Sequence, residues 1–266
     1  MNEAEDEAEF GGKAVNLARA LRAGLSVPPG YALSYEWVEA VTRDDPTVLT
    51  ELESAFGKMK TPIAVRSSAV GEDSEGASFA GQHLSVLNVT SLSNLKSAVV
   101  DVVESALTPS AQSYREKLGV EGPPRMGVVL QELLDTDAAG VMFTRNPLNG
   151  VDERVIEAAW GLGEVVVAGL VIPDYYRLSP EGEVLECRVG EKDVELRLLA
   201  EGGTEEVEVS PERANSRILD DTDLLNLHRL ALGCESVYGE GLDIEWGLAE
   251  GTLSLLQCRS ITTSES

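Results

Sequence analysis

The segment Ile63–Val89 carries the residues best suited to chemistry in this chain. A short apolar run leads to Arg66, Ser67 and Ser68, and a small-residue run, Ala77–Gln82, precedes a second apolar run. A guanidinium beside hydroxyls, with glycines that let backbone N–H groups approach a ligand, is suited to holding a polyphosphate. The alternative is a polar hairpin with one surface arginine, but the density of Ser, Gly and Gln favours a binding segment.

A glycine pair and a lysine stand at the predicted start of a helix: Gly11, Gly12 and Lys13. Apolar residues at helical spacing follow, and Gly24 is placed to end the helix before a proline pair. Backbone donors, the positive end of the helix dipole and an ammonium group would meet an anion there. Without other evidence, a Gly-Gly-Lys triplet indicates an ordinary lysine in a loop rather than an anion-binding site.

A hairpin near the end of the sequence carries a second set of capable residues. Its predicted strands cover residues 243–248 and 252–259. We expect symmetric pairing about Glu250, which places these residues opposite each other: Asp243 and Gln257, Glu245 and Leu255.

Three polar side chains project from one face of this hairpin, because strand side chains alternate. They are Glu245, Gln257 and Arg259. Two hard oxygen donors beside a guanidinium suit a magnesium-bound triphosphate, with Arg259 on the terminal phosphates. The alternative is an exposed face with an ordinary arginine–glutamate pair.

Apolar periodicity predicts the elements that position these residues. Helices are predicted over Tyr35–Thr42, Thr47–Phe56 and Leu92–Leu107. Met126–Leu133 and Ala138–Thr144 are predicted to be strands that pair with each other around a short acidic turn. The first half of the chain is therefore expected to mix helices with an antiparallel sheet.

A strand ending near Ala158 runs into the glycine-containing segment Trp160–Glu164, which we interpret as a connection between subdomains. We place the boundary near Glu157, so that residues 1–156 and 157–266 form the two subdomains. Antiparallel strands are expected over 184–189, 194–198 and 207–209. A helix capped by Asp220 or Asp221 is expected to end at Gly239.

Composition limits the classes of function. The chain has 266 residues, enough for a large core, and a net charge of −25, which disfavours nucleic acid and anionic lipid as partners. Its three cysteines are far apart and predict neither a disulfide framework nor a zinc site. No signal peptide and no membrane-length apolar run is evident, so we expect a cytoplasmic protein.

Five segments, in this order, resemble the nucleotide-binding domain of the phosphoenolpyruvate synthase (pyruvate, water dikinase), pyruvate phosphate dikinase and rifampicin phosphotransferase family. They are Gly11–Leu33, Ile63–Val89, Gln131–Gly150, Glu157–Leu178 and Asp243–Thr262. The resemblance covers nearly the whole chain. It implies an α+β fold of the ATP-grasp type, with two subdomains and the nucleotide in the cleft between them.

The resemblance also implies ATP and Mg²⁺ as cofactors and assigns roles to residues. Arg66 and Arg259 match catalytic arginines, and Glu245 and Gln257 match magnesium ligands. Residues matched to nucleotide binding are Lys13, Arg66, Ser67, Ser68, Gly81, Gln82, Gln131, Glu157 and Arg259.

Family members that complete a reaction carry a swivelling domain with a phosphorylatable histidine. The two histidines here, His83 and His228, do not stand in that sequence context. We therefore predict a kinase or phosphotransferase component that moves phosphate from Mg-ATP to a histidine or hydroxyl supplied by another chain or molecule, with a separate histidine-domain protein as partner. The alternative is a non-catalytic ATP-binding regulatory module; a carboxylate–amine ligase fits the motifs less well.

Overall fold

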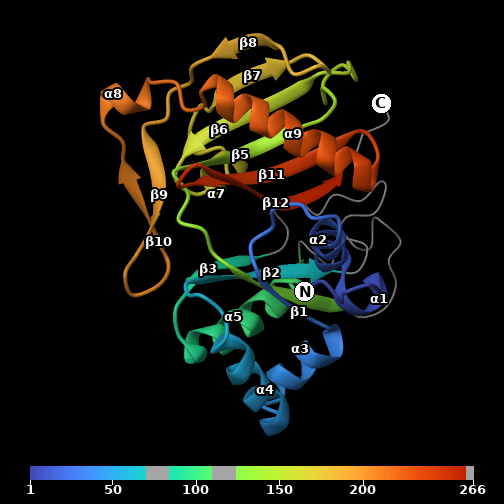
Figure 1. The fold of residues 1–266 in the computed structure, drawn as a ribbon. Coiled ribbons are helices and arrows are strands. Elements are labelled where there is room, and N and C mark those ends of the chain that lie inside the picture. Colours follow the sequence, from blue (N-terminus) through green and yellow to red (C-terminus); the bar gives the residue numbers. More distant parts are fainter. Residues whose placement is uncertain (70–83, 110–123, 262–266) are drawn as a thin grey trace. The chain divides into compact units, whose positions relative to one another are not determined.

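The computed structural model describes residues 1–69, 84–109 and 124–261, which form two compact units (Figure 1). Unit 1 comprises Met1–Arg19, Pro28–Leu133 and Leu199–Gly203. Unit 2 comprises Ala20–Val27, Leu134–Leu198 and Thr204–Ser266. No helix in the described part of the chain is long and apolar enough to cross a membrane.

Unit 1 is built on an antiparallel sheet whose strands, within the described residues, lie in the order β1-β4-β2-β3 (Figure 1). The strands are β1 (Gly30–Leu33), β2 (Ile63–Ala69), β3 (Ser85–Val89) and β4 (Met126–Glu132). The two strands predicted around Arg66 are β2 and β3, and they pair with each other. Strand β4 lies between β1 and β2, so β1 forms an edge of the sheet.

Three helices, α3 (Tyr35–Thr42), α4 (Pro46–Phe56) and α5 (Leu92–Ser105), match the predicted ranges closely. Ser34, Asp45 and Ser91 cap them by accepting hydrogen bonds from the first-turn backbone. Their apolar sides pack on one face of the sheet, and each fully buried Val or Leu contributes roughly 1.5–3 kcal/mol. The buried residues of this core are Leu33, Val38, Val41, Leu52, Ile63, Val65, Val89, Leu95, Ala98, Val99, Val102, Val128 and Leu130.

The N-terminal segment covers the opposite face of the unit 1 sheet. It contains α1 (Glu7–Phe10) and the start of α2 (Gly12–Arg22). A Cβ added to Gly127 of β4 would lie 2.3 Å from the Phe10 carbonyl oxygen, so the backbones touch where no side chain would fit.

Unit 2 contains a larger antiparallel sheet, in the order β12-β11-β5-β6-β7-β8 within the described residues (Figure 1). Its strands are β5 (Ala138–Phe143), β6 (Arg154–Trp160), β7 (Asp174–Leu178), β8 (Val184–Arg188), β11 (Leu242–Ala249) and β12 (Thr252–Ser260). One face is apolar and buried, with Met142, Ile156, Tyr176 and Ile244 in a single cross-strand row. The other face is more polar and partly exposed.

Helix α9 (Asp221–Tyr238) packs against β11 and β12. Its start is a capping box in which Asp220 accepts from the Asp223 backbone and Asp223 accepts from the Asp220 backbone. Gly239, at φ 91°, follows its last residue as predicted. The remaining elements of unit 2 are α7 (Glu164–Val167), α8 (Pro211–Ala214) and the antiparallel ribbon of β9 (Val194–Leu198) and β10 (Thr204–Glu208).

An ion pair between Lys192 and Asp174 is fully buried in unit 2. Asp174 also accepts hydrogen bonds from the Gly190 backbone (2.8 Å), the Ile218 backbone (2.9 Å) and the Tyr176 hydroxyl (3.0 Å). The carboxylate therefore ties three segments of unit 2 together.

The prediction that the strands at 126–133 and 138–144 pair with each other is wrong. Strand β4 pairs with β1 and β2, whereas β5 pairs with β11 and β6. The acidic turn between them therefore links two different sheets. Glu157, the predicted subdomain boundary, lies inside β6 of unit 2, and one point at which the chain passes from unit 1 to unit 2 lies between Leu133 and Leu134.

Candidate functional site

In unit 1, three predicted binding residues lie on one face of the sheet: Arg66, Ser68 and Gln131. Arg66 and Ser68 are two residues apart on β2, and Gln131 pairs with the neighbouring Ala64, so alternation directs all three to the same side. The Arg66 Nη1 donates to the Gln131 Oε1 over 3.3 Å, and the Gln131 Nε2 donates to the Pro28 carbonyl. The guanidinium is thus held in place by a buried amide.

The Gly11–Lys13 segment is fixed against this same face. The Ser68 Oγ accepts a hydrogen bond from the Ala14 backbone over 3.0 Å, in the first turn of α2. Gly11 has φ 79°, and a Cβ there would lie 1.9 Å from the Ser68 carbonyl oxygen. Lys13 is 5% exposed, so its side chain is buried close to the helix start. The structure therefore brings Lys13 and Ser68 to one part of unit 1.

Three other predicted binding residues of the segment Ile63–Val89 are not placed on this face by the structure. Ser67 is 1% exposed, and strand alternation places it on the face that packs against α3 and α5, opposite Arg66. Gly81 and Gln82 lie outside the described residues, as does His83.

In unit 2, a cross-strand row on the more polar face contains most of the predicted ligands. Gln257 lies opposite Glu245, Glu245 opposite Val141, and Val141 opposite Glu157. Glu245 and Gln257 are direct neighbours, so their side-chain oxygens can share a ligand. Glu157 is two strand spacings from Glu245, roughly 10 Å.

Arg259 lies in the next row of the same face, opposite Asp243. Its Nε and Nη2 both donate to the Asp243 Oδ2, over 2.9 and 2.7 Å. We had not assigned a role to Asp243. Its position two residues before Glu245 on one strand, and hence on the same face, is the signal that could have revealed it.

The predicted register of this hairpin is wrong, although the predicted face is right. A tight turn at Glu250 and Gly251, both with positive φ, joins Ala249 to Thr252, and a bulge follows Glu245. These two one-residue shifts add up to two. Because side chains alternate with a period of two, Glu245, Gln257 and Arg259 still share a face.

Burial affects the pKa of two carboxyl groups on this face. It raises the pKa of the Asp243 carboxyl; Arg259 opposes that rise, and Glu245 adds to it. Burial also raises the pKa of the Glu157 carboxyl. A partly desolvated carboxylate gains from a nearby cation.

The chemistry of this face fits Mg²⁺. Glu245 and Gln257 offer the hard oxygen donors that magnesium accepts, usually with water and phosphate completing the shell. Within the described residues, no group of three or more His, Cys, Asp and Glu side chains could hold a metal ion by itself. A two-ligand site that is completed by a nucleotide is compatible with that finding.

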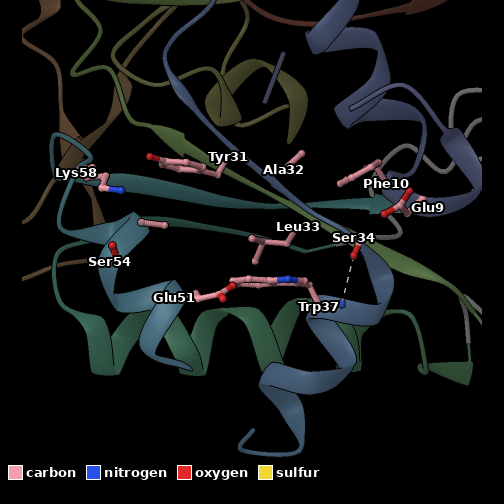
Figure 2. Close-up of a pocket in the computed structure, with 11 residues that line it drawn as sticks. Glu9, Phe10, Tyr31, Ala32, Leu33, Ser34, Trp37, Glu51, Ser54 and Lys58 are labelled. Carbon is pink, nitrogen blue, oxygen red and sulfur yellow. Dashed lines mark hydrogen bonds between the residues drawn. The ribbon is translucent and has the colours of Figure 1, made fainter. Parts of the chain in front are cut away.

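Unit 1 also contains a cavity of about 510 Å³ that none of the predicted site residues line. It runs beside β1, with Glu9 and Phe10 at one end and Ser54 and Lys58 at the other (Figure 2). Its aromatic lining residues are Phe10, Tyr31 and Trp37.

Comparison with known proteins supports the expected resemblance. Residues 45–266 match the model of the family described as pyruvate phosphate dikinase, AMP/ATP-binding domain. The chain belongs to this family. Its fold is α+β, as predicted.

Curated relatives are longer than this chain. An uncharacterized phosphotransferase, YvkC, of Bacillus subtilis is 32% identical over 99% of the chain and 34% of its own length. A probable phosphoenolpyruvate synthase of Methanothermobacter thermautotrophicus is 33% identical over 97% of the chain and 45% of its own length. Rifampicin phosphotransferase of Streptomyces sviceus is 36% identical over 77% of the chain and 24% of its own length. The chain thus spans less than half the length of these relatives.

Proposed function

We propose that this chain binds Mg-ATP and passes a phosphoryl group to a histidine or hydroxyl acceptor on another chain or molecule. The observation that carries the proposal is the polar face of unit 2, where Glu245 and Gln257 are neighbours and Arg259 is paired with Asp243. Family membership supports the nucleotide. As the partner that supplies an acceptor histidine, we propose a separate swivelling histidine-domain protein.

Each group of residues has a part in this proposal. Glu245 and Gln257 would hold the magnesium ion, which supplies charge neutralisation on the phosphates when bound. Lys13 and Arg66 in unit 1 bind phosphate oxygens, with Arg66 aligned by Gln131. Phosphoryl transfer depends mainly on such positioning and neutralisation, because the protein supplies little covalent chemistry.

Arg259 stabilises the charge that develops on the transferred phosphoryl group. Asp243 holds the guanidinium through two hydrogen bonds to one of its carboxylate oxygens, and a guanidinium held in this way is suited to phosphate. Glu157 lies farther along the row and serves a different part of the nucleotide, for which we propose the adenine. Of the two histidines, His228 is 6% exposed within α9, a poor position for a phosphate carrier.

Calorimetric titration of ATP, with and without Mg²⁺, tests nucleotide binding. We expect Glu245→Gln to reduce the magnesium-dependent part of the affinity at least tenfold, because it removes a charged ligand. Glu250→Gln is the matched control, since it makes the same charge change at the exposed turn of the same hairpin. Absence of binding at millimolar ATP with Mg²⁺ would refute the proposal.

Arg259→Ala separates the enzyme from a non-catalytic binding module. For an enzyme, transfer of label from ATP to a histidine-domain protein should fall by a factor of about 10²–10³, while ATP affinity changes little. Arg229→Ala, on exposed α9 surface, should leave both unchanged. A chain that binds ATP normally, yet labels no candidate acceptor even as the unaltered protein, would favour the regulatory module.

A further inference from the structure

Strand β1 has a free edge. It pairs with β4 on one side, and no strand among the described residues pairs with its other side. The outer edge of an antiparallel strand presents backbone N–H and C=O groups that can pair with another chain. Extended peptides use such edges as binding sites in many proteins.

The cavity of about 510 Å³ lies along this edge, and its lining includes all of Tyr31–Ser34. Figure 2 shows the Trp37 indole beneath Leu33, between the Glu9–Phe10 end and the Ser54–Lys58 end. Its volume is within the ~300–1,000 Å³ range of ligand sites. The groove therefore joins unpaired backbone groups with aromatic side chains.

The two sides of the groove differ because side chains on β1 alternate. Leu33 and Tyr31 face the helical core, near Trp37 and Ala55 of the lining. Ala32 faces the other side, which the segment ending at Phe10 covers. A strand added to β1 would direct alternate side chains to these two sides.

The charges at the rim favour a basic ligand. Glu9 and Glu51 are exposed lining residues, whereas Lys58 is the sole cation among the residues that line the described groove. The net charge of −25 adds a long-range attraction for cations.

We propose that this groove binds an extended peptide of a partner protein, added as a strand to β1. Apolar side chains at every second position rest on Trp37 and Leu33. Basic side chains at the alternate positions lay their stems along Phe10 toward the Glu9 carboxylate. Glu51, on α4 at the helical side of the groove, adds a second negative charge that attracts the peptide through space. This function is independent of the nucleotide, because the groove shares no residue with the proposed ATP-binding groups.

Calorimetry with the full chain and the peptide acetyl-Arg-Val-Arg-Val-Arg-amide tests the proposal. We expect micromolar to submillimolar binding, and slower hydrogen exchange of backbone amides within Tyr31–Ser34 when the peptide is present. Two methylated peptides extend the test: one carries N-methyl groups on the backbone nitrogens of both valines, and the other on the backbone nitrogen of the central arginine. We expect one of these peptides, and not the other, to bind at least tenfold more weakly than the unmodified peptide. In a strand, successive N–H groups point to opposite edges, so only one set can pair with β1.

The variants Glu51→Lys and Glu53→Lys provide a matched comparison. Both residues are exposed on α4 and both changes alter net charge equally, but only Glu51 lines the groove. We expect Glu51→Lys to weaken binding roughly fivefold and Glu53→Lys to change it less than twofold. Equal effects of the two variants, no slowing of exchange in β1, or equal binding of acetyl-Glu-Val-Glu-Val-Glu-amide would each overturn the proposal.

Discussion

Replacing Lys192 with methionine probes the buried ion pair of unit 2. Both side chains of the Lys192–Asp174 pair are 0% exposed. Methionine keeps a similar length and removes the ammonium, so the Asp174 carboxylate stays buried without its cation. Breaking such a pair costs about 3–5 kcal/mol. Three neutral donors still bind Asp174, which places the expected loss near the lower end, about 3 kcal/mol.

Urea unfolding followed by tryptophan fluorescence measures this loss. Trp160 in unit 2 is a suitable reporter, since its Nε1 donates to the Arg213 carbonyl and its ring stacks on the Arg213 guanidinium. The double variant Asp174→Asn/Lys192→Met removes both charges and should regain about half of the loss.

The exposed Lys96–Asp44 ion pair supplies the control. Lys96→Met should cost less than about 1 kcal/mol, because water reaches both side chains of that pair, which are 39% and 66% exposed. A loss below about 1 kcal/mol in Lys192→Met, or an equal loss in the double variant, would refute the reasoning.

Three further predictions concern single positions. Gly11→Ala should lower the free energy of unfolding in urea by about 2 kcal/mol or more and weaken ATP binding. Gly24 has nearly the same φ, but a Cβ added there would meet no atom within 4 Å, so Gly24→Ala should cost only about 1 kcal/mol. Ser68→Ala should lower ATP affinity by removing an acceptor worth roughly 0.5–1.5 kcal/mol, and an equal loss of affinity in Ser67→Ala would contradict the assigned faces. Burial lowers the pKa of His228 in the folded chain. The stability that this neutral histidine contributes is therefore complete above pH 6.5, the pKa of an unperturbed histidine, and is lost as the pH falls below it. Between pH 7 and pH 5, the urea midpoint of unfolding should therefore fall less in His228→Gln than in the unaltered chain.

Local features of the sequence were sufficient for most helices. The range Tyr35–Thr42 was predicted to the residue, because a capping serine and helical periodicity are encoded within a few positions. Asp220 and Gly239 likewise identified the ends of α9. The family also followed from sequence motifs.

Strand partners could not be obtained in the same way. The strands at 126–132 and 138–143 are adjacent in sequence and still belong to different units, since β4 pairs with β1 and β2 whereas β5 pairs with β11 and β6. The bulge after Glu245 was equally hidden, because alternation of side chains shows the face of a strand but not its register.

By itself, the sequence determined the ends of several helices and the shared face of Glu245, Gln257 and Arg259, whereas the phosphate and metal roles of its side chains stay predictions. Only the tertiary structure decided that Asp243 holds Arg259 and that Glu157 lies in the same row as Glu245. It also decided that β1, among the described residues, pairs with a strand on one side only and lies beside an aromatic groove. The physical reason is range: caps and alternation depend on neighbours along the chain, whereas register, edge position and buried partners depend on which distant strands meet.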